Sequence, residues 1–228
     1  LCAQPFGSGT KITTTADGAQ EVYAADIDGD GDQDVLSASF RDNKIAFYRN
    51  GDETSGDGTS WTETVITITA DGAESVFAAD IDGDGDQDVL SASSRDDTIA
   101  FYRNGDSTSG DGDGNAWTET EITTAADGAR SVHAGGMSVF AADIDRDGDH
   151  DVLSASSGDE TVAFYRNGDG TSGDGDGTSW TKTEITTAFG SPSVFAADID
   201  GDGDHDVLSE SNNDDTIAFY RNGDGTSG

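Results

Sequence analysis

The sequence predicts an all-β protein built from four copies of one four-stranded unit, and three observations support this. The nine residues DIDGDGDQD at 26–34 return almost unchanged at 80–88, 143–151 and 198–206. Similar short runs of β-forming residues flank every copy. No segment keeps a helical period over about ten residues or more. Because the copies start 54, 63 and 55 residues apart, the pattern is typical of a repeat architecture.

The second unit contains the expected elements in order. An apolar run, Ser75–Ile81, leads directly into the acidic loop, and a strand rich in small and β-branched residues follows at Asp88–Ser94. After a polar turn at Arg95–Asp97 comes a third strand, Thr98–Asn104. A loop rich in Gly and Asp then leads to Trp117–Ala125, whose period-two alternation predicts a half-buried strand. We call these four predicted strands a, b, c and d.

The two ends of the chain are out of step with this unit. Lys11–Thr15 matches the end of the d strand of the next copy, Val65–Thr69, whereas the last copy stops after a c strand at Thr216–Asn222. The last unit therefore lacks a d strand, and the first d strand lacks a unit. Pairing the two, within one chain or between neighbouring chains, would complete four sheets.

Four short antiparallel strands per repeat are typical of β-propeller blades. We therefore predict a single domain over 1–228: a β-propeller of four four-stranded antiparallel blades, with the acidic loop between strands a and b and the last blade completed by the N-terminal strand. An insertion at Arg130–Met137 lengthens the third period and is the best candidate for a contact specific to this protein. The approximate repeat units are 11–61, 62–117, 118–180 and 181–228.

Composition argues against several classes of partner. The chain carries 11 Lys and Arg against 47 Asp and Glu, a formal net charge of −36, so we expect neither nucleic acid nor anionic membrane surfaces as partners. No apolar run approaches the roughly 18–20 residues of a membrane span. A single cysteine, Cys2, cannot form an intrachain disulfide.

The acidic loops have the composition of a cation site. Each loop places carboxylates at positions 1, 3, 5 and 9 and glycine at position 6. Ca²⁺ takes six to eight oxygen ligands at about 2.3–2.6 Å, which alternate aspartates in a tight loop supply. An EF-hand is excluded, because a β-forming segment follows and position 12 holds a serine in place of a bidentate Glu (Ser37, Ser91, Ser154 and Ser209). The sequence thus predicts about four Ca²⁺ per chain.

Loops, flanking strands and period together resemble the FG-GAP/VCBS repeat of integrin-type and microbial extracellular β-propellers, from Lys11 to Gly228. The resemblance implies that Ca²⁺ is held by the side chains at loop positions 1, 3, 5 and 9 and by the backbone carbonyl at position 7. The implied side-chain ligands are Asp26, Asp28, Asp30 and Asp34; Asp80, Asp82, Asp84 and Asp88; Asp143, Asp145, Asp147 and Asp151; and Asp198, Asp200, Asp202 and Asp206. The implied carbonyl ligands are those of Asp32, Asp86, Asp149 and Asp204. Related propellers commonly have seven blades, so a four-bladed ring, part of a longer propeller and one unit of an assembly all stay open.

Two further features each allow two interpretations. The c–d loops, rich in Gly and Asp, either bind additional cations or are solvated connections (Gly51–Ser60, Gly105–Ala116 and Gly168–Ser179). The tryptophans that open the d strands either stack on a sugar ring or pack between neighbouring blades (Trp61, Trp117 and Trp180). Recurrence at one structural position favours packing.

Catalysis finds little support in the sequence. His150 and His205 stand at loop position 8, where the other copies carry Gln33 and Gln87, and no serine lies in a nucleophile-elbow sequence. We therefore expect no enzymatic activity. The near-equivalence of the repeats favours a structural or assembly module of a filament, coat or adhesive layer; the alternative is a carbohydrate-binding lectin or a cell-adhesion receptor.

We expect the protein to be secreted or on the cell surface. Calcium loops of extracellular modules bind at roughly 10⁻⁴–10⁻³ M and would fill outside a cell. Leu1–Gln4 could be the tail of a secretory signal. The expected partners are further copies of the chain through the terminal strands, glycans or extracellular proteins.

Overall fold

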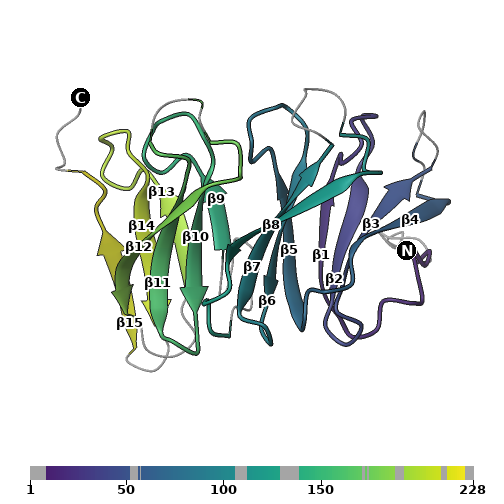
Figure 1. The fold of residues 1–228 in the computed structure, drawn as a ribbon, viewed down its shortest axis with the longest axis horizontal. Helices are drawn as coiled ribbons and strands as arrows, with labels where there is room; N and C mark the ends of the chain where they lie inside the picture. The colour runs from purple at the N-terminus through teal and green to yellow at the C-terminus, as the bar shows by residue number, and fades with distance from the viewer. Residues whose placement is uncertain are drawn as a thin grey trace, which may run out of the picture.

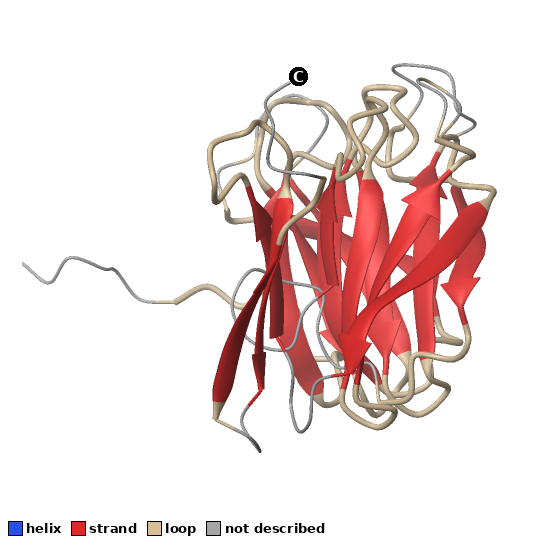
Figure 2. Cartoon of the chain, turned by 90° about the vertical axis from the view of Figure 1, so that its left-hand side faces the viewer, coloured by secondary structure: helices blue, strands red, loops and turns tan. Residues whose placement is uncertain are grey.

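The computed structural model describes residues 9–51, 56, 58–105, 112–128, 139–170, 173, 175–187, 193–211 and 215–223. Within them the chain forms strands, turns and loops and no helix. The strands make four antiparallel sheets that follow one another in a row along the long axis of the molecule (Figure 1). Seen from the end of that row, the strands run between two layers of loops (Figure 2). No helix long and apolar enough to cross a membrane occurs in the described part of the chain.

The strands of each sheet are consecutive in the sequence. Sheet 1 contains β1 (Ala19–Ala25), β2 (Asp34–Ser39), β3 (Lys44–Asn50) and β4 (Trp61–Thr67). Sheet 2 contains β5 (Ala73–Ala79), β6 (Asp88–Ser93), β7 (Thr98–Asn104) and β8 (Trp117–Thr123). Sheet 3 contains β9 (Val139–Ala142), β10 (Asp151–Ser156), β11 (Thr161–Asn167) and β12 (Trp180–Thr187). Sheet 4 contains β13 (Ser193–Ala197), β14 (Asp206–Ser211) and β15 (Thr216–Tyr220).

The predicted strand order is confirmed, and the sheets are suited to be propeller blades. In sheet 2, Ala79 pairs with Asp88 and Val89 with Tyr102, so the acidic loop joins the first two strands as expected. Because neighbouring strands are antiparallel, the acidic loop and the c–d loop of each sheet lie at the same end. Within the described residues, the last sheet has three strands and the sheets do not close into a ring.

Every sheet has two apolar faces, because side chains alternate along a strand. Phe101 of β7 lies on the face toward sheet 3, and the adjacent Tyr102 lies on the face toward sheet 1. We call these the C-terminal face and the N-terminal face of a sheet. Both rings are fully buried, at 0% and 1% exposure. The Phe-Tyr pairs of sheets 2 and 3 therefore join each of these sheets to both of its neighbours.

Three apolar clusters form the core, one between each pair of adjacent sheets. The first joins Ile27, Leu36 and Phe47 of sheet 1 to Val76 and Tyr102 of sheet 2. The second and third repeat the arrangement between sheets 2 and 3 and between sheets 3 and 4. The expected packing of tryptophan between blades is confirmed at two positions, where the side chain lies against the first and second clusters (Trp117 and Trp180).

The predicted N-terminal strand is not formed. Residues 11–15 have no strand conformation, and no described segment pairs with the free edge of β15. Instead, the side of sheet 1 that no described sheet covers borders a pocket lined by Ile12, Val22, Val35 and Tyr48. The physical reason is distance: sheet 1 and β15 lie at opposite ends of the row (Figure 1). Cys2, the insertion at 130–137 and part of each c–d loop lie outside the described residues.

Candidate metal centres

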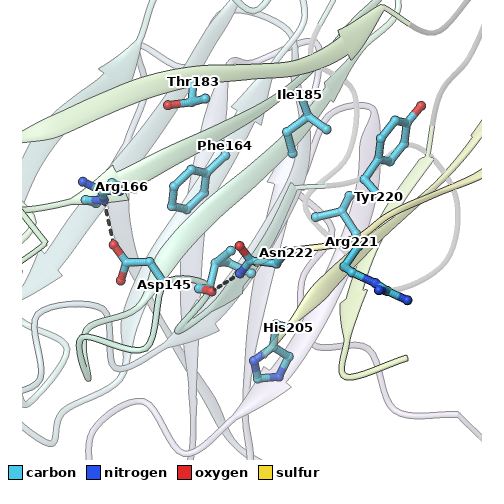
Figure 3. A pocket seen from close by; sticks show the side chains of 11 residues that line it. Asp145, Phe164, Arg166, Thr183, Ile185, His205, Tyr220, Arg221 and Asn222 are labelled. Atoms are coloured by element: carbon cyan, nitrogen blue, oxygen red, sulfur yellow. Dashed lines mark hydrogen bonds and ion pairs between the residues drawn. The ribbon is translucent and has the colours of Figure 1, made fainter. Parts of the chain in front are cut away.

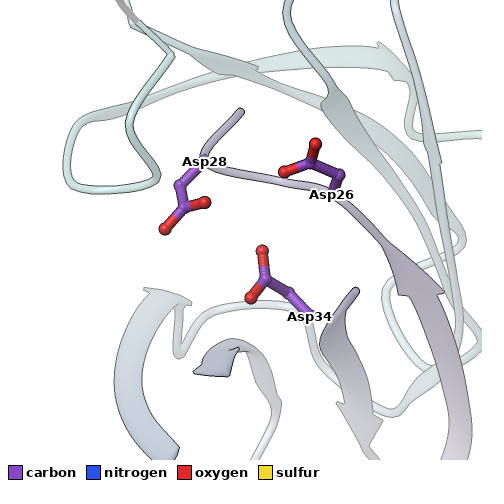
Figure 4. A group of neighbouring side chains, drawn as sticks. All are labelled: Asp26, Asp28 and Asp34. Atoms are coloured by element: carbon purple, nitrogen blue, oxygen red, sulfur yellow. The ribbon is translucent and has the colours of Figure 1, made fainter. Parts of the chain in front are cut away.

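Three carboxylates converge in each acidic loop. Asp26 at position 1, Asp28 at position 3 and Asp34 at position 9 offer oxygens that lie within 4.8 Å of one another (Figure 4). The other three loops form the same group from their equivalent residues: Asp80, Asp82 and Asp88; Asp143, Asp145 and Asp151; Asp198, Asp200 and Asp206. Oxygens this close repel one another unless a cation or a proton lies between them. Each group could hold a metal ion.

Buried oxygens without hydrogen-bond partners fit the same interpretation. Within the described residues, Oδ1 of Asp26 at position 1 and Oδ2 of Asp30 at position 5 are buried and accept no hydrogen bond. The equivalent oxygens of other loops share this property (Asp80 Oδ1, Asp84 Oδ2, Asp143 Oδ1, Asp147 Oδ2 and Asp202 Oδ2). A buried carboxylate oxygen without a hydrogen-bond partner is costly, and Ca²⁺ is a cation that prefers carboxylate oxygens as ligands. The residues present therefore fit a hard cation. The position-5 aspartates are not among the carboxylates that converge within 4.8 Å.

Backbone hydrogen bonds fix the position-9 carboxylate. Asp88 is 0% exposed; its Oδ2 accepts from the Ile81 N–H at 2.9 Å and its Oδ1 from the Asn104 N–H at 2.9 Å. Burial raises the pKa of Asp88 to about 7, more than these hydrogen bonds lower it. Burial likewise raises the pKa values of Asp34 and Asp151 to about 6. A divalent cation at this place would favour the charged carboxylates.

The position-7 side chain holds the neighbouring c–d loop. Asp86 Oδ2 accepts a hydrogen bond from the Gly112 N–H at 2.9 Å, and Asp149 Oδ2 accepts from Gly175 at 2.8 Å. This side chain is thus engaged with the protein, which leaves its backbone carbonyl as the group that the resemblance assigns to the metal. The sequence did not predict this contact between the acidic loop and the c–d loop.

An arginine from the c strand pairs with every position-3 carboxylate. Nε of Arg49 lies 2.5 Å from Asp28 Oδ2, and Nε of Arg103 lies 2.6 Å from Asp82 Oδ2. The pairs Arg166–Asp145 and Arg221–Asp200 repeat the contact at 2.7 Å. Arg49 also donates from Nη2 to the carbonyl of Asp113 in the c–d loop of sheet 2 at 2.6 Å. Each arginine therefore orients a carboxylate, and Arg49 ties its loop to the next sheet.

The asparagine that follows this arginine connects consecutive acidic loops. Asn104 donates its backbone N–H to Asp88 of its own loop and its Nδ2 to the carbonyl of Ile27, at loop position 2 of sheet 1, at 2.8 Å. Ile27 in turn donates its N–H to Asp34 at 3.0 Å. The same Nδ2 contact runs from Asn167 to Ile81 at 3.1 Å and from Asn222 to Ile144 at 2.7 Å. One series of hydrogen bonds thus passes through all four position-9 carboxylates.

Glycine at loop positions 4 and 6 meets a backbone requirement. Gly83 and Gly85 have φ of 75° and 98°, in the left-handed region that glycine adopts without a steric cost. In the third loop Arg146 occupies position 4 with φ of 65°, and its Nη1 lies 2.7 Å from Asp204 of the fourth loop. That loop therefore carries backbone strain that the others avoid.

A family comparison identifies these repeats. The FG-GAP-like repeat model matches residues 26–91, 80–154 and 143–209, each match starting at an aspartate loop. The chain belongs to the FG-GAP-like repeat family. Each matched FG-GAP-like span begins at the acidic loop of one sheet and ends in the b strand of the following sheet. Together the three spans therefore cover all three junctions between the four sheets. No curated protein matches the chain.

Solved structures of other proteins are similar to this chain, among them the following two. One is an Agrocybe aegerita lectin described by its specific recognition of non-reducing terminal N-acetylglucosamine, with a TM-score of 0.53, 19% identity, and coverage of 91% of this chain and 51% of the lectin. The other is the Photorhabdus luminescens Tc holotoxin pore, with a TM-score of 0.46, 14% identity, and coverage of 93% of this chain and 9% of that chain. The chain thus spans about half the length of the lectin, and this likeness concerns the fold alone.

Sequence reasoning identified the aspartates but missed the residues that position them. The signal was present, because Arg-Asn ends all four c strands (Arg49–Asn50, Arg103–Asn104, Arg166–Asn167 and Arg221–Asn222). A polar pair that recurs at the end of a buried strand indicates fixed partners. The partners themselves lie in other loops and sheets, which spacing along one chain does not reveal.

Proposed function

We propose that this FG-GAP-like protein is a non-enzymatic extracellular calcium-binding propeller with a structural or assembly role, in a filament, coat or adhesive layer. Ca²⁺ would bind at the four acidic loops through the aspartates at positions 1, 3, 5 and 9, with the position-7 carbonyl. There it would neutralise carboxylates that burial has brought together. Its role would be to rigidify each loop and, through the loop, the contact with the next sheet.

The hydrogen-bond series between loops is the observation that supports this role best. In an enzyme or a receptor we would expect one distinctive site, whereas here the same contacts recur at each junction. Asn104, Asn167 and Asn222 each tie one acidic loop to the preceding one. A cation that orders one loop therefore stabilises a junction between sheets, which is what a mechanical element requires.

Chelation tests the proposal. We expect EDTA to lower the melting temperature and to dissociate any polymer, measured by circular dichroism and light scattering with and without 10 mM CaCl₂. Magnesium at the same concentration is the control, because it demands near-ideal octahedral geometry and gives up its water reluctantly. A melting temperature that calcium does not change would sink the calcium role.

The pH dependence gives a second test of the same sites. Burial raises the folded-state pKa of Asp34, Asp88 and Asp151 to between about 6 and 7, above the ordinary 3.8. Between pH 4 and 7 the metal-free folded chain therefore binds protons that the unfolded chain has released. We expect metal-free stability to rise as pH falls from 7 to 5, and calcium-bound stability to fall, because protons compete with the metal.

A lectin is the alternative, favoured by one pocket. A space of about 440 Å³ lies between the first two acidic loops and is lined by polar groups, among them Asp26, Gln33 and Gln87. Such a space between blades could accept a sugar. Glycan-array screening of the calcium-loaded protein separates the two functions: a monodisperse monomer that binds one glycan class supports the lectin and contradicts the assembly module.

A further inference from the structure

Apolar positions that are buried between sheets elsewhere are exposed at the two ends of the row. Ile217, on the C-terminal face of sheet 4, is 83% exposed, whereas its equivalent in sheet 2, Ile99, is 0% exposed. Val22, on the N-terminal face of sheet 1, is 67% exposed, whereas its equivalent Val76 is 0% exposed. The two exposed faces are thus the two halves of the interface that occurs three times within the chain. Exposed apolar patches of this kind indicate a binding surface.

The polar contacts of that interface are also divided between the ends. At each internal junction an asparagine Nδ2 donates to the position-2 carbonyl of the preceding sheet, as Asn104 does to Ile27. Asn50 is the corresponding donor in sheet 1, which no described sheet precedes. Ile199 is the corresponding acceptor residue in sheet 4, which no described sheet follows, and it is 47% exposed. A donor position at one end therefore matches an acceptor position at the other.

The N-terminal segment already lies where the fourth strand of a preceding sheet would lie. Ile12 lines a pocket with Val35 and Tyr48 of sheet 1. In register Ile12 corresponds to Ile122, which packs in the cluster that contains Tyr165 of the following sheet. Thr15 donates its N–H to Thr13 Oγ1 at 3.2 Å, the same contact that Thr69 makes with Thr67 after β4. The segment thus has the local conformation that follows a d strand.

A cavity marks the place that the missing strand leaves in sheet 4. About 230 Å³ of space lies between sheets 3 and 4, lined by Phe164, Ile185 and Tyr220 (Figure 3). At the two earlier junctions a tryptophan from the fourth strand of the later sheet packs at the corresponding cluster (Trp117 and Trp180). The junction of sheets 3 and 4 has no such residue among those described. The lack of a described fourth strand in sheet 4 therefore accounts for both the cavity and the unpaired edge of β15.

We propose that a second copy of this chain docks its sheet 1 against sheet 4 and adds its N-terminal segment as the fourth strand beside β15. Residues 11–13 of that segment correspond to the end of β4 and β8. Asn50 of the incoming copy then donates to the Ile199 carbonyl, and Val22 covers the face that carries Ile217. The contact is heterologous, so it repeats from copy to copy and builds an open chain. This inference rests on the proposed assembly function and gives it an interface.

Charge sets the conditions for this contact. Each copy carries a formal net charge of −36, which opposes association of identical chains. Salt screens the repulsion between exposed charges at distances beyond about 8–10 Å at 0.1–0.15 M. Association should therefore be stronger in calcium at 0.15 M salt than in chelator at low salt.

Sedimentation velocity of the whole chain in calcium tests the proposal. Wild-type protein should form species that lengthen with concentration. Ile217→Asp removes one docking face and Val22→Asp removes the other, so each variant alone should stay monomeric. Mixed together, the two variants should form one-to-one dimers and nothing larger, because each retains one working end. Val65→Glu is the matched control: it charges an exposed apolar residue at a position where sheets 2 and 3 carry Glu121 and Glu184, and it should assemble like wild type.

Hydrogen exchange reports the added strand. Amide exchange in β15 should slow at least tenfold in assembled wild-type protein and not in Ile217→Asp. If wild-type chains assemble and both Asp variants assemble equally well, the interface is wrong while the assembly function stands. If the wild-type chain stays monomeric at every concentration in calcium, the assembly function fails with it, and protection of β15 in that monomer would indicate closure within one chain.

Discussion

The second and fourth acidic loops have nearly the same sequence but different surroundings. In both, the position-9 aspartate accepts from the N–H of the position-2 isoleucine and from the N–H of the asparagine that follows the c-strand arginine, and Asp206 accepts from the Asp200 N–H as well. The loops differ in sequence at position 8, where Gln87 is replaced by His205. Sheet 3 covers the second loop, so Ile81 at position 2 is 1% exposed, whereas Ile199 in the fourth loop is 47% exposed. The difference arises from the neighbouring sheet and not from the loop.

The electrostatics of the two loops follow their surroundings. Burial raises the pKa of Asp88 to about 7, above what its backbone hydrogen bonds can offset. At Asp206 burial also acts to raise the pKa, but the N–H groups of Asn222, Ile199 and Asp200 together outweigh it, and the pKa is lowered. A covered loop would thus gain more from a bound cation than an open one would. The same loop sequence can carry position-9 carboxylates of different pKa according to what packs on it.

Truncation of the c-strand phenylalanine should give the largest contrast between a covered and an open sheet. Phe101 is 0% exposed and Phe219 is 43% exposed. Phe101→Ala should cost about 3–5 kcal/mol of unfolding free energy through cavity formation. Phe219→Ala should cost roughly 1–2 kcal/mol, because part of its area is already in water. Urea denaturation at concentrations where the chain is monomeric measures both; equal losses would contradict the comparison.

Loss of one proposed calcium ligand should have an effect that depends on calcium. Asp80→Asn keeps an oxygen that can accept from the Gly85 N–H but removes the charge at position 1. With calcium at ten to one hundred times its dissociation constant, the variant should lose about 1.4–2.7 kcal/mol of stabilisation. In EDTA it should lose nothing, because a repelling charge is removed as well.

The control for this experiment is an aspartate outside the loops. Asp71 forms an exposed ion pair with Arg95 at 3.5 Å, so Asp71→Asn should change stability by less than about 1 kcal/mol in either buffer. Thermal melts of both variants, with and without calcium, supply the comparison. A loss for Asp80→Asn that is as large in EDTA as in calcium would mean that the position-1 carboxylate acts without metal.

The hydrogen bond between sheets should be measurable as a difference between two alanine variants. Asn104 and Asn50 both accept from a c–d loop glycine, at 3.0 and 2.8 Å, but only Asn104 has a preceding sheet to which it donates. Asn104→Ala should therefore cost about 1 kcal/mol more than Asn50→Ala. In a polymer the two costs should become equal, because Asn50 then has its own acceptor.

The strained third loop should give the smallest effect. Arg146 has φ of 65° where other loops have glycine, which costs roughly 1 kcal/mol, and its half-exposed ion pair with Asp204 returns less than about 1 kcal/mol. Arg146→Gly should thus raise stability by a few tenths of a kcal/mol. The reciprocal change, Gly83→Arg, should lower it by roughly 1 kcal/mol. Melting curves of both variants measure these changes in stability. A lower stability of Arg146→Gly would mean that the ion pair with Asp204 contributes more than the backbone strain costs.

Repetition made most of the fold predictable from the sequence. Any ambiguity in one strand was resolved by the other copies, so Asp88–Ser94 and Thr98–Asn104 were placed to within one residue. The aspartates were predictable for the same reason, since their spacing is local. The prediction of a strand at Lys11–Thr15 was wrong, because its expected edge partner, β15, lies at the far end of the row. Strand formation there depends on a tertiary contact that local sequence does not contain.

The contacts between sheets were the least predictable part of the site. Asn104 and Ile27 are 77 residues apart in sequence, and nothing in either repeat alone connects them. The position-7 aspartates were assigned to the metal by their carbonyls, while their side chains serve the c–d loop through Gly112 and Gly175. Both contacts follow from the stacking of sheets, which sets distances that spacing along the chain leaves undetermined.

The asparagine contact has a consequence for how such proteins grow. Asn104, Asn167 and Asn222 each donate to the position-2 carbonyl of the preceding sheet. The same hydrogen bond therefore occurs at every described junction. A duplicated repeat could pack against both neighbouring sheets through the same contacts, and deletion of a repeat would bring together two faces that are still complementary. No contact at a junction depends on the total number of sheets. Blade number in such a lineage can therefore change by whole units, while every surviving contact stays as it was.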